Sequence, residues 1–216
     1  TICCLKGYVI IMLKIGIIGA GRIGKVHLES ISYHVKNATV TAMADPFMNE
    51  ETEKLIRSYG VSKVTKDYKD ILNDKDIDAV LVCSSTDTHA AISIEAINAG
   101  KHVFCEKPLG TDVAQCKAAQ KVIEAHPDLI FQLGFMRRFD KSYAEAKRKI
   151  DNGDIGKVVL VRSYTQDPRS TIESTLKFAP HSGGQYLDMC VHDIDLIRWF
   201  TESEIAEVQP QLSKAV

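Results

Sequence analysis

Short apolar runs alternate with amphipathic stretches along residues 13–134 of this chain. The apolar runs are rich in β-branched residues and predict strands at 14–18, 39–44, 63–65, 79–83, 102–105 and 129–133. The amphipathic stretches between them predict helices at 23–34, 48–59, 68–73, 88–99 and 112–125. Strands that alternate with helices are typical of a parallel sheet with right-handed crossovers. We therefore expect an α/β fold with a doubly wound parallel sheet.

The pattern changes after residue 135. The remaining sequence predicts a helix at 141–152, a longer strand at 158–164, an irregular polar loop at 166–181, a long helix at 184–201 and one more strand at 204–211. We therefore expect two domains, a first over residues 12–135 and a partial second over residues 136–216.

Residues 1–11 precede Met12, which stands directly before the first predicted strand, and we interpret them as a leader or as residues added for expression. The apolar run at 8–13 is shorter than the ~7–15 residues of a signal-peptide core, and no small-residue cleavage site follows it. No stretch approaches the ~18 consecutive apolar residues of a membrane span. We expect no membrane partner.

Composition excludes several classes of protein. The 216 residues contain 27 Lys plus Arg and 28 Asp plus Glu, a net charge of −1, so the basic surface typical of nucleic-acid binders is not expected. The hydrophobic share of 45% is that of an ordinary globular chain. None of the six cysteines forms a C-x-x-C pair, which favours a reducing, cytoplasmic setting over a zinc site or a disulfide framework.

A glycine-rich motif follows the first predicted strand and opens the first predicted helix. It consists of Gly19, Ala20, Gly21, Arg22, Ile23 and Gly24, a G-x-G-x-x-G. Such glycines permit a tight turn and close approach of a pyrophosphate, which the N–H groups of the helix N-terminus then hold. Asp45 ends the second predicted strand, where an acid accepts hydrogen bonds from an adenosine ribose. Because Asp45 would repel a 2′-phosphate and Pro46 rather than an arginine follows it, we expect NAD and not NADP as cofactor.

Two further segments follow predicted strands, at the edge where parallel sheets bind ligands. The first contains Ser84, Ser85, Thr86 and His89. Its hydroxyls border the nicotinamide ribose or diphosphate in one interpretation and cap the next helix in the other, and the residues favour neither. The second segment is Glu106-Lys107-Pro108. A loop lysine is ordinarily a solvated surface charge, but this position favours a role beside the reactive end of a cofactor.

Asp188 and His192 are spaced i, i+4 on the last predicted helix. On an α-helix they share one face, so the carboxylate can orient the imidazole of a general base. The alternative is a surface pair that stabilises the helix by tenths of a kcal/mol. Asp193 and Asp195 lie nearby, but a metal site needs three or four converging ligands, and we expect none.

Together these segments resemble a known family. GIIGAGRIGKVH, AGKHVFCEKPL, LGFMRRFDKSY and GGQYLDMCVHDIDLIRW are similar, in this order, to motifs of the glucose–fructose oxidoreductase/inositol dehydrogenase (Gfo/Idh/MocA) family, and the last two to its inositol dehydrogenases. The resemblance implies an N-terminal Rossmann domain, a C-terminal α/β domain with a mostly antiparallel sheet, and oxidation of a ring hydroxyl by NAD. It also implies that Lys107 touches the reacting oxygen, His192 takes its proton and Asp188 supports that exchange. Met136 and Arg137 would lie beside the substrate or the nicotinamide.

We therefore expect a dehydrogenase of a cyclic polyol, with myo-inositol oxidised at C2 to the ketone, and another inositol isomer or a sugar as the alternative substrate. The resemblance also implies a longer chain, a homo-oligomer for a full-length member, and a second domain with more strands than the two predicted here. A truncated fragment that binds NAD without turnover is thus the alternative from a different class. A non-catalytic cofactor sensor is disfavoured, because Lys107, Asp188 and His192 are all present.

Overall fold

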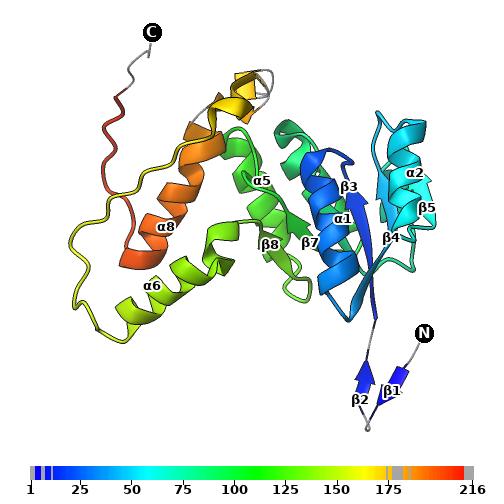
Figure 1. Cartoon of the computed structure of the whole chain (residues 1–216), viewed down its shortest axis with the longest axis horizontal. Coiled ribbons are helices and arrows are strands. Elements are labelled where there is room, and N and C mark those ends of the chain that lie inside the picture. Colours follow the sequence, from blue (N-terminus) through cyan, green and yellow to red (C-terminus); the bar gives the residue numbers. More distant parts are fainter. Residues whose placement is uncertain are drawn as a thin grey trace.

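The computed structural model describes residues 12–173, 175–176, 182–184 and 186–211, and the backbone of two short N-terminal strands. These strands, β1 (Cys3–Leu5) and β2 (Tyr8–Ile10), pair antiparallel in a two-stranded sheet of their own (Figure 1). The main sheet starts at β3, immediately after Met12.

Six parallel strands form the main sheet, in the spatial order β5-β4-β3-β6-β7-β8 (Figure 1). The strands are β3 (Leu13–Ile18), β4 (Ala38–Ala44), β5 (Lys63–Thr65), β6 (Ala79–Val82), β7 (His102–Cys105) and β8 (Phe131–Leu133). All six predicted strands are thus confirmed, two of them with the same bounds and four with one end that differs by one or two residues. The order reverses between β3 and β6, as in dinucleotide-binding folds, so a crevice for ligands is expected at the carboxyl ends of these two strands.

Helices cover both faces of the sheet. They are α1 (Arg22–His34), α2 (Glu50–Ser58), α3 (Lys69–Leu72), α4 (His89–Asn98) and α5 (Val113–Glu124), which confirms the five predicted helices. One hydrophobic cluster joins α1 and α2 to one face, and a second joins α3, α4 and α5 to the other. The part of the chain from β3 to β8 is therefore a doubly wound α/β fold, as predicted.

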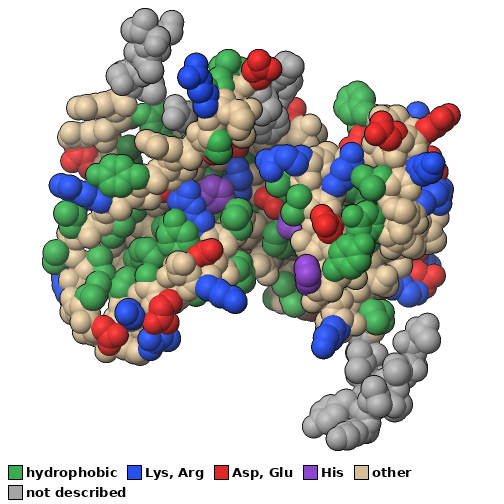
Figure 2. All heavy atoms as spheres, in the orientation of Figure 1, with side chains coloured by type: hydrophobic (Ala, Val, Ile, Leu, Met, Phe, Trp, Pro, Cys, Tyr) green, Lys and Arg blue, Asp and Glu red, His purple; other side chains and the backbone are tan. Residues whose placement is uncertain are grey.

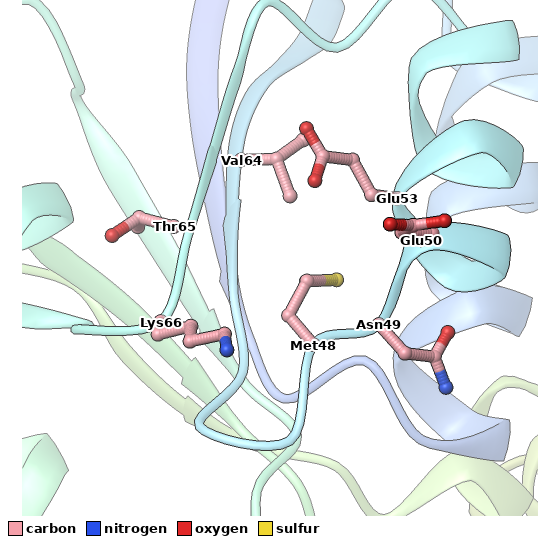
Figure 3. Close-up of a pocket in the computed structure, with 7 residues that line it drawn as sticks. All are labelled: Met48, Asn49, Glu50, Glu53, Val64, Thr65 and Lys66. Carbon is pink, nitrogen blue, oxygen red and sulfur yellow. The ribbon is translucent and has the colours of Figure 1, made fainter.

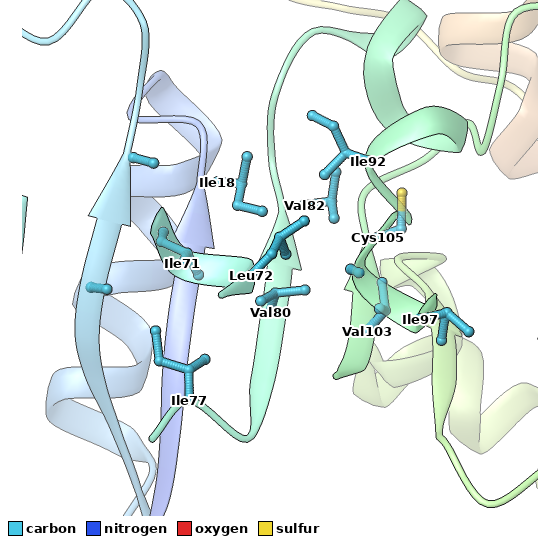
Figure 4. Close-up of a cluster of buried hydrophobic side chains, with 13 residues drawn as sticks. Ile18, Ile71, Leu72, Ile77, Val80, Val82, Ile92, Ile97, Val103 and Cys105 are labelled. Carbon is cyan, nitrogen blue, oxygen red and sulfur yellow. The ribbon is translucent and has the colours of Figure 1, made fainter. Parts of the chain in front are cut away.

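The two clusters arise from the alternation of side chains along the central strands. Ile15 and Ile17 of β3 belong to the cluster under α1 and α2, while Ile18 belongs to the opposite cluster, which Figure 4 shows. In β6, Val80 and Val82 lie in the second cluster and Leu81 lies in the first. Central strands of a parallel sheet are covered on both faces, which is why these runs are apolar throughout.

After the sheet the chain forms short helical elements and extended segments. They are η2 (Met136–Phe139), α6 (Lys141–Asp151), η3 (Arg169–Thr171), the π-helical turn η4 (Tyr186–Cys190) and α8 (Val191–Thr201). The helix predicted at 141–152 is confirmed as α6. The predicted loop at 166–181 and helix at 184–201 lie partly outside the described residues, and the described part of that helix starts with a π-helical rather than an α-helical turn.

The two strands predicted at 158–164 and 204–211 are wrong for this structure, since neither segment forms regular secondary structure or pairs with a strand. A strand needs a neighbour to take up its N–H and C=O groups, and the described residues provide none for either segment. Val159 is 90% exposed, and Figure 2 shows hydrophobic side chains spread over the part formed by α6, α8 and the chain between them. The sequence pattern of these segments predicts a buried face that the described residues do not cover.

Arginine–carboxylate contacts attach α8 to the segment that follows β8. Arg138 of η2 donates from Nε and Nη2 to the two carboxylate oxygens of Asp195, at 2.9 and 2.7 Å. Its guanidinium also lies 5.5 Å from the ring centre of Trp199. Asp195 is only 5% exposed, so this bidentate pair fixes the middle of α8 against η2, the segment that follows the edge strand β8.

Candidate active site

The predicted site residues gather at one edge of the molecule because they follow the carboxyl ends of parallel strands. The glycine motif follows β3, Asp45 follows β4, and Glu106 with Lys107 follows β7. The second half of the chain adds η4 and α8, which reach this edge through the contact of Lys107 with Asp188.

The glycine motif leaves room for a phosphate at the start of α1. Gly19 has φ +107° and donates its N–H to the carbonyl of Ala44, while a Cβ there would lie 2.4 Å from the carbonyl oxygen of Cys83. A Cβ on Gly24 would lie 2.0 Å from the carbonyl oxygen of Gly19, so close packing of helix and strand also requires glycine. At Gly21 no atom lies within 4 Å of an added Cβ, and no side chain caps the helix. Uncapped N–H groups beside open space fit the pyrophosphate of a dinucleotide.

Asp45 stands at the carboxyl end of β4, as predicted for a ribose-binding acid. Its carboxylate accepts hydrogen bonds from the N–H of Ala20 at 2.7 Å and of Phe47 at 2.8 Å. A carboxylate has about four lone-pair sites, so these two bonds leave acceptor capacity for ribose hydroxyls. The same residue therefore holds the glycine motif against β4.

The segment after β6 binds to itself rather than capping the next helix. The hydroxyls of Ser84 and Thr88 lie 2.7 Å apart, and Thr88 Oγ1 also donates to the carbonyl of Ser85. No side-chain cap occurs at either η1 (Thr86–Thr88) or α4, so the capping interpretation is wrong. Ser85 is exposed at the site edge and Thr86 is buried.

His89 was predicted to bind the cofactor, but the structure encloses its ring in protein. It is 2% exposed, with Nδ1 2.8 Å from the carbonyl oxygen of Pro108 and Nε2 3.0 Å from that of Ser84. An imidazole between two loops contacts backbone instead of ligand. Its place at the first position of α4 explains this, since that position faces the neighbouring loop after β7.

Glu106 makes a contact that the sequence did not indicate. Its Oε1 lies 2.7 Å from Nε2 of His27, which belongs to α1. Burial alone would raise the pKa of Glu106, but the hydrogen bond with His27 and the charge of Lys107 lower it below its usual range. The only sequence signal for His27 is its position three residues after Gly24, on the half-buried side of the helix. The peptide bond between Lys107 and Pro108, which the sequence leaves open, is cis.

Lys107 pairs with Asp188. Its Nζ donates to Asp188 Oδ1 at 2.9 Å and to the carbonyl oxygen of Asp188 at 2.7 Å, and both side chains are largely buried. The predicted partnership of Asp188 with His192 is replaced by this pair. The reason is local geometry, because Asp188 lies in the π-helical turn η4 and i, i+4 side chains align only on an α-helix.

His192 lies in the first turn of α8 with its Nδ1 buried and without a hydrogen-bond partner among the described residues. The ring of Phe135 meets it edge-on, with 6.5 Å between ring centres. Burial lowers the pKa of His192, and the positive charges of Lys107 and Arg137 lower it further. The imidazole is therefore neutral at pH 7, the state in which it can accept a proton.

Met136 and Arg137 were predicted to lie beside substrate or nicotinamide. Met136 is largely exposed, whereas Arg137 donates to Asp193 Oδ1 at 2.7 Å and to the hydroxyl of Thr165 at 2.8 Å. Burial would raise the pKa of Asp193, but hydrogen bonds from Ser163, Thr165 and Arg137 lower it. Arg137 therefore acts on His192 through charge while its guanidinium is bound to Asp193.

A cavity of about 550 Å³ adjoins Asp188. Its lining includes the polar side chains of Thr165, Gln166, Asp167 and Thr171 and the apolar side chains of Ile172, Leu176 and Met189. Hydroxyl, amide and carboxylate groups next to a lysine–aspartate pair suit a ligand rich in hydroxyl groups.

A second cavity, of about 490 Å³, lies between the start of α2 and the end of β5. Figure 3 shows Glu50 and Glu53 extending from α2 and Met48 pointing into this space. None of the predicted site residues lines it, although two lining residues, Thr65 and Met48, are hydrogen-bonded through their backbones to Asp45.

No helix among the described residues is long and apolar enough to cross a membrane. The same part of the chain contains no group of three or more His, Cys, Asp or Glu side chains arranged to hold a metal ion. Asp193 and Asp195 are instead paired with Arg137 and Arg138.

Comparison with protein families gives two matches. Residues 13–135 match the model described as the Gfo/Idh/MocA oxidoreductase family, NAD-binding Rossmann fold, and residues 143–216 match the Gfo/Idh/MocA C-terminal domain.

Named relatives are inositol dehydrogenases. The chain is 38% identical over 198 residues to the myo-inositol 2-dehydrogenase of Thermotoga maritima and 36% identical over 196 residues to the NAD-dependent scyllo-inositol 2-dehydrogenase of Bacillus subtilis. Each alignment covers 91% of this chain and 57% or 56% of the relative. The chain thus spans little more than half the length of the curated relatives it matches.

Solved structures agree with these relatives. The scyllo-inositol dehydrogenase of Lactobacillus casei with bound NAD(H) and scyllo-inositol superposes with a TM-score of 0.82 at 44% identity, covering 88% of this chain and 56% of that one. The myo-inositol 2-dehydrogenase of Lactobacillus plantarum gives a TM-score of 0.83, with the same identity and coverage.

Proposed function

Because this chain belongs to the Gfo/Idh/MocA oxidoreductase family, we propose that it provides the cofactor site and the proton-transfer groups of an NAD-dependent dehydrogenase acting on an inositol. The observation that carries the proposal is the Lys107–Asp188 pair, which joins the carboxyl end of β7 to the segment just before His192. It brings a cation, a carboxylate and a neutral imidazole to the edge of the sheet where a dinucleotide binds.

The cofactor site is formed by the first part of the chain. The N-terminus of α1 and the open space at Gly21 hold the pyrophosphate, and Asp45 accepts hydrogen bonds from the adenosine ribose. Ser84 and Ser85 would border the nicotinamide side, whereas Thr86 is buried beneath them. When bound, NAD supplies an acceptor for the hydride that leaves the substrate carbon.

The proton-transfer groups are on the other side of the crevice. His192 takes the proton from the substrate hydroxyl, since its lowered pKa keeps it neutral at pH 7. The ammonium group of Lys107 stabilises the negative charge that develops on that oxygen. Asp188 holds the lysine in place through a 2.9 Å ion pair. The alcohol loses a hydride and a proton and becomes a ketone.

The substrate we propose is myo-inositol, oxidised at C2, with scyllo-inositol as the alternative. The support is the cavity beside Asp188, where the polar groups of Thr165, Gln166 and Asp167 can bind hydroxyls and the apolar side chains that line the rest can face the C–H groups of a ring. The relatives include enzymes named for each isomer at similar identity, so the isomer is a question for assay.

The test is a turnover assay of the purified chain with NAD or NADP and a panel of inositols and sugars, alongside an NADH titration. The side chains of Val159, Leu160 and Tyr164 are exposed, which supports a second possible outcome. In this outcome the chain binds NAD, oxidises inositol weakly and self-associates through these apolar side chains. NADH binding without turnover, together with a large species in light scattering, would favour this NAD-binding fragment. Turnover near ~10 s⁻¹ in a small soluble species would favour the complete enzyme. Failure to bind NADH would contradict both.

A further inference from the structure

A histidine contacts each of the two residues that flank Lys107 in the chain. On the N-terminal side, Oε1 of Glu106 lies 2.7 Å from Nε2 of His27, while Oε2 accepts the N–H of Lys107 at 3.3 Å. The His27 and Glu106 side chains are largely buried, 25% and 19% exposed. The ring of Phe104 also packs edge-on against the imidazole, 5.3 Å between ring centres. A buried carboxylate needs such a partner, so His27 determines where Glu106 and the lysine N–H lie.

On the C-terminal side, the support is His89. Its Nδ1 lies 2.8 Å from the carbonyl oxygen of Pro108, the residue after Lys107. Its Nε2 lies 3.0 Å from the carbonyl oxygen of Ser84, and the ring is 2% exposed. Carbonyl oxygens only accept and a neutral imidazole carries a single N–H, so the ring donates to one of these carbonyls and lies against the other, between the loop after β7 and the loop after β6.

The lysine side chain itself is held at its far end by Asp188. A lysine loses up to about 1.5–2 kcal/mol of rotamer freedom when its side chain is fixed. Holding the amine in one place therefore requires that the backbone from which it extends is also fixed. Glu106 and Pro108 are the neighbours through which that backbone is held.

We propose that His27 and His89 are positioning residues, which brace the backbone on both sides of Lys107 so that its amine meets Asp188 and the reacting oxygen. This inference rests on the proposed function, in which Lys107 stabilises that oxygen. Both histidines lie on elements that also form the cofactor edge, His27 on α1 and His89 at the start of α4. The brace thus fixes the lysine relative to the cofactor site as well as relative to the substrate.

The experiment measures how fast each lysine reacts with an amine-labelling ester, read residue by residue by mass spectrometry on the whole chain without cofactor or substrate. His27→Leu and His89→Leu remove the donors, whereas His27→Gln keeps a donor near Nε2 and His89→Asn keeps one near Nδ1. We expect labelling of Lys107 to rise about fivefold in each leucine variant, the factor for one lost hydrogen bond, and to remain near that of the parent chain in the matched variants.

Two controls separate bracing from general loosening. Lys101 is buried and donates to the carbonyls of Asp74 and Ile77, so its labelling rises only if the sheet opens. His34→Leu changes an exposed histidine at the end of α1 and should leave Lys107 unaffected. Where a leucine variant fails to fold, His27→Asn and His89→Gln, which place the donor at the other ring position, serve as the comparison.

Unchanged labelling of Lys107 in the donor-removing variants, or a rise in step with Lys101, would overturn the proposal. Because the reading needs no turnover, it remains valid if the chain proves inactive. Inactivity of a chain whose Lys107 is braced in this way would count against the proposed function alone.

Discussion

The amine of Lys107 donates to both the side chain and the backbone carbonyl of Asp188, at 2.9 and 2.7 Å. This pair joins the carboxyl end of β7 to the π-helical turn before α8, two segments far apart in the sequence. It leaves His192 without the carboxylate partner that an α-helical spacing predicts. The pKa of the imidazole is therefore lowered by burial and by the nearby cations of Lys107 and Arg137.

The pH dependence of His192 follows from its surroundings. Burial and the charges of Lys107 and Arg137 lower its pKa below the ~6.5 of an ordinary histidine, so its neutral form persists into more acidic solution. We expect the acid limb of the turnover profile to rise with a midpoint below pH 6.5. An NMR titration of the His192 ring in the chain without ligand should likewise give a pKa below 6.5. A midpoint above 6.5 in both measurements would contradict the assignment.

Replacing His192 should affect the chemical step and spare cofactor binding. His192→Ala should lower turnover by ~10²–10⁴, the usual contribution of a positioned acid–base group. The NADH affinity should stay within about twofold of the parent chain, because His192 lies outside the glycine motif. His126→Ala is the matched control, since His126 lies at the end of α5 and bonds the carbonyl of Val122. Equal turnover of the two variants would show that His192 is not the base.

Two glycines of the motif should respond differently to alanine. A Cβ on Gly24 would lie 2.0 Å from the carbonyl oxygen of Gly19, so Gly24→Ala should destabilise the fold by about 1–3 kcal/mol, the usual cost of overpacking. No atom lies within 4 Å of a Cβ added at Gly21, so Gly21→Ala should leave the melting temperature unchanged. The added methyl group would occupy the space proposed for the pyrophosphate, so the affinity for NADH should fall. Thermal melts and NADH titrations of both variants are the measurements. A Gly21→Ala variant that binds NADH normally would place the pyrophosphate elsewhere.

Asp45 should determine both affinity and cofactor preference. Asp45→Ala removes the acceptor for the ribose hydroxyls and the repulsion of a 2′-phosphate. The affinity for NADH should therefore fall about tenfold, and the difference in affinity between NADH and NADPH should become smaller. Because Asp45 also accepts from Ala20 and Phe47, Asp45→Asn is the better matched variant, since it keeps one oxygen acceptor and removes the charge. Tighter binding of NADPH than of NADH by the parent chain would refute the assignment.

Replacing Arg138 should destabilise the fold more than replacing its partner Asp195. Asp195 is 5% exposed, whereas the Arg138 side chain is 39% exposed and also lies against Trp199. Arg138→Met leaves a buried carboxylate without its partner and should cost about 2–4 kcal/mol, less than a fully buried pair because water reaches the arginine. Asp195→Asn should cost less, since the guanidinium can turn to solvent. Urea unfolding of both variants measures the difference, and an equal loss would contradict it.

The sequence was sufficient for the parallel sheet because its strands are buried on both faces and its helices are amphipathic. It also predicted the edge where Gly19, Asp45 and Lys107 meet, since carboxyl ends of parallel strands share one side. It was not sufficient for His27 or for the pairing of Asp188. The first contact joins residues far apart in the chain, and the second depends on a π-helical turn that has no recognisable sequence pattern. The segments at 158–164 and 204–211 have strand-like sequences but no neighbouring strand among the described residues.

The strand order has a consequence for how the cofactor crevice is assembled as the chain is synthesised. On one side Ile18 pairs with Ala44 of the next strand, and on the other side it pairs with Val82, which leaves the ribosome much later. One wall of the turn at Gly19 is the carbonyl of Ala44, and the other is the backbone of Cys83. Domains fold as units during synthesis. A nascent chain that ends before β6 therefore lacks the crevice, and the crevice forms only when β6 joins the sheet.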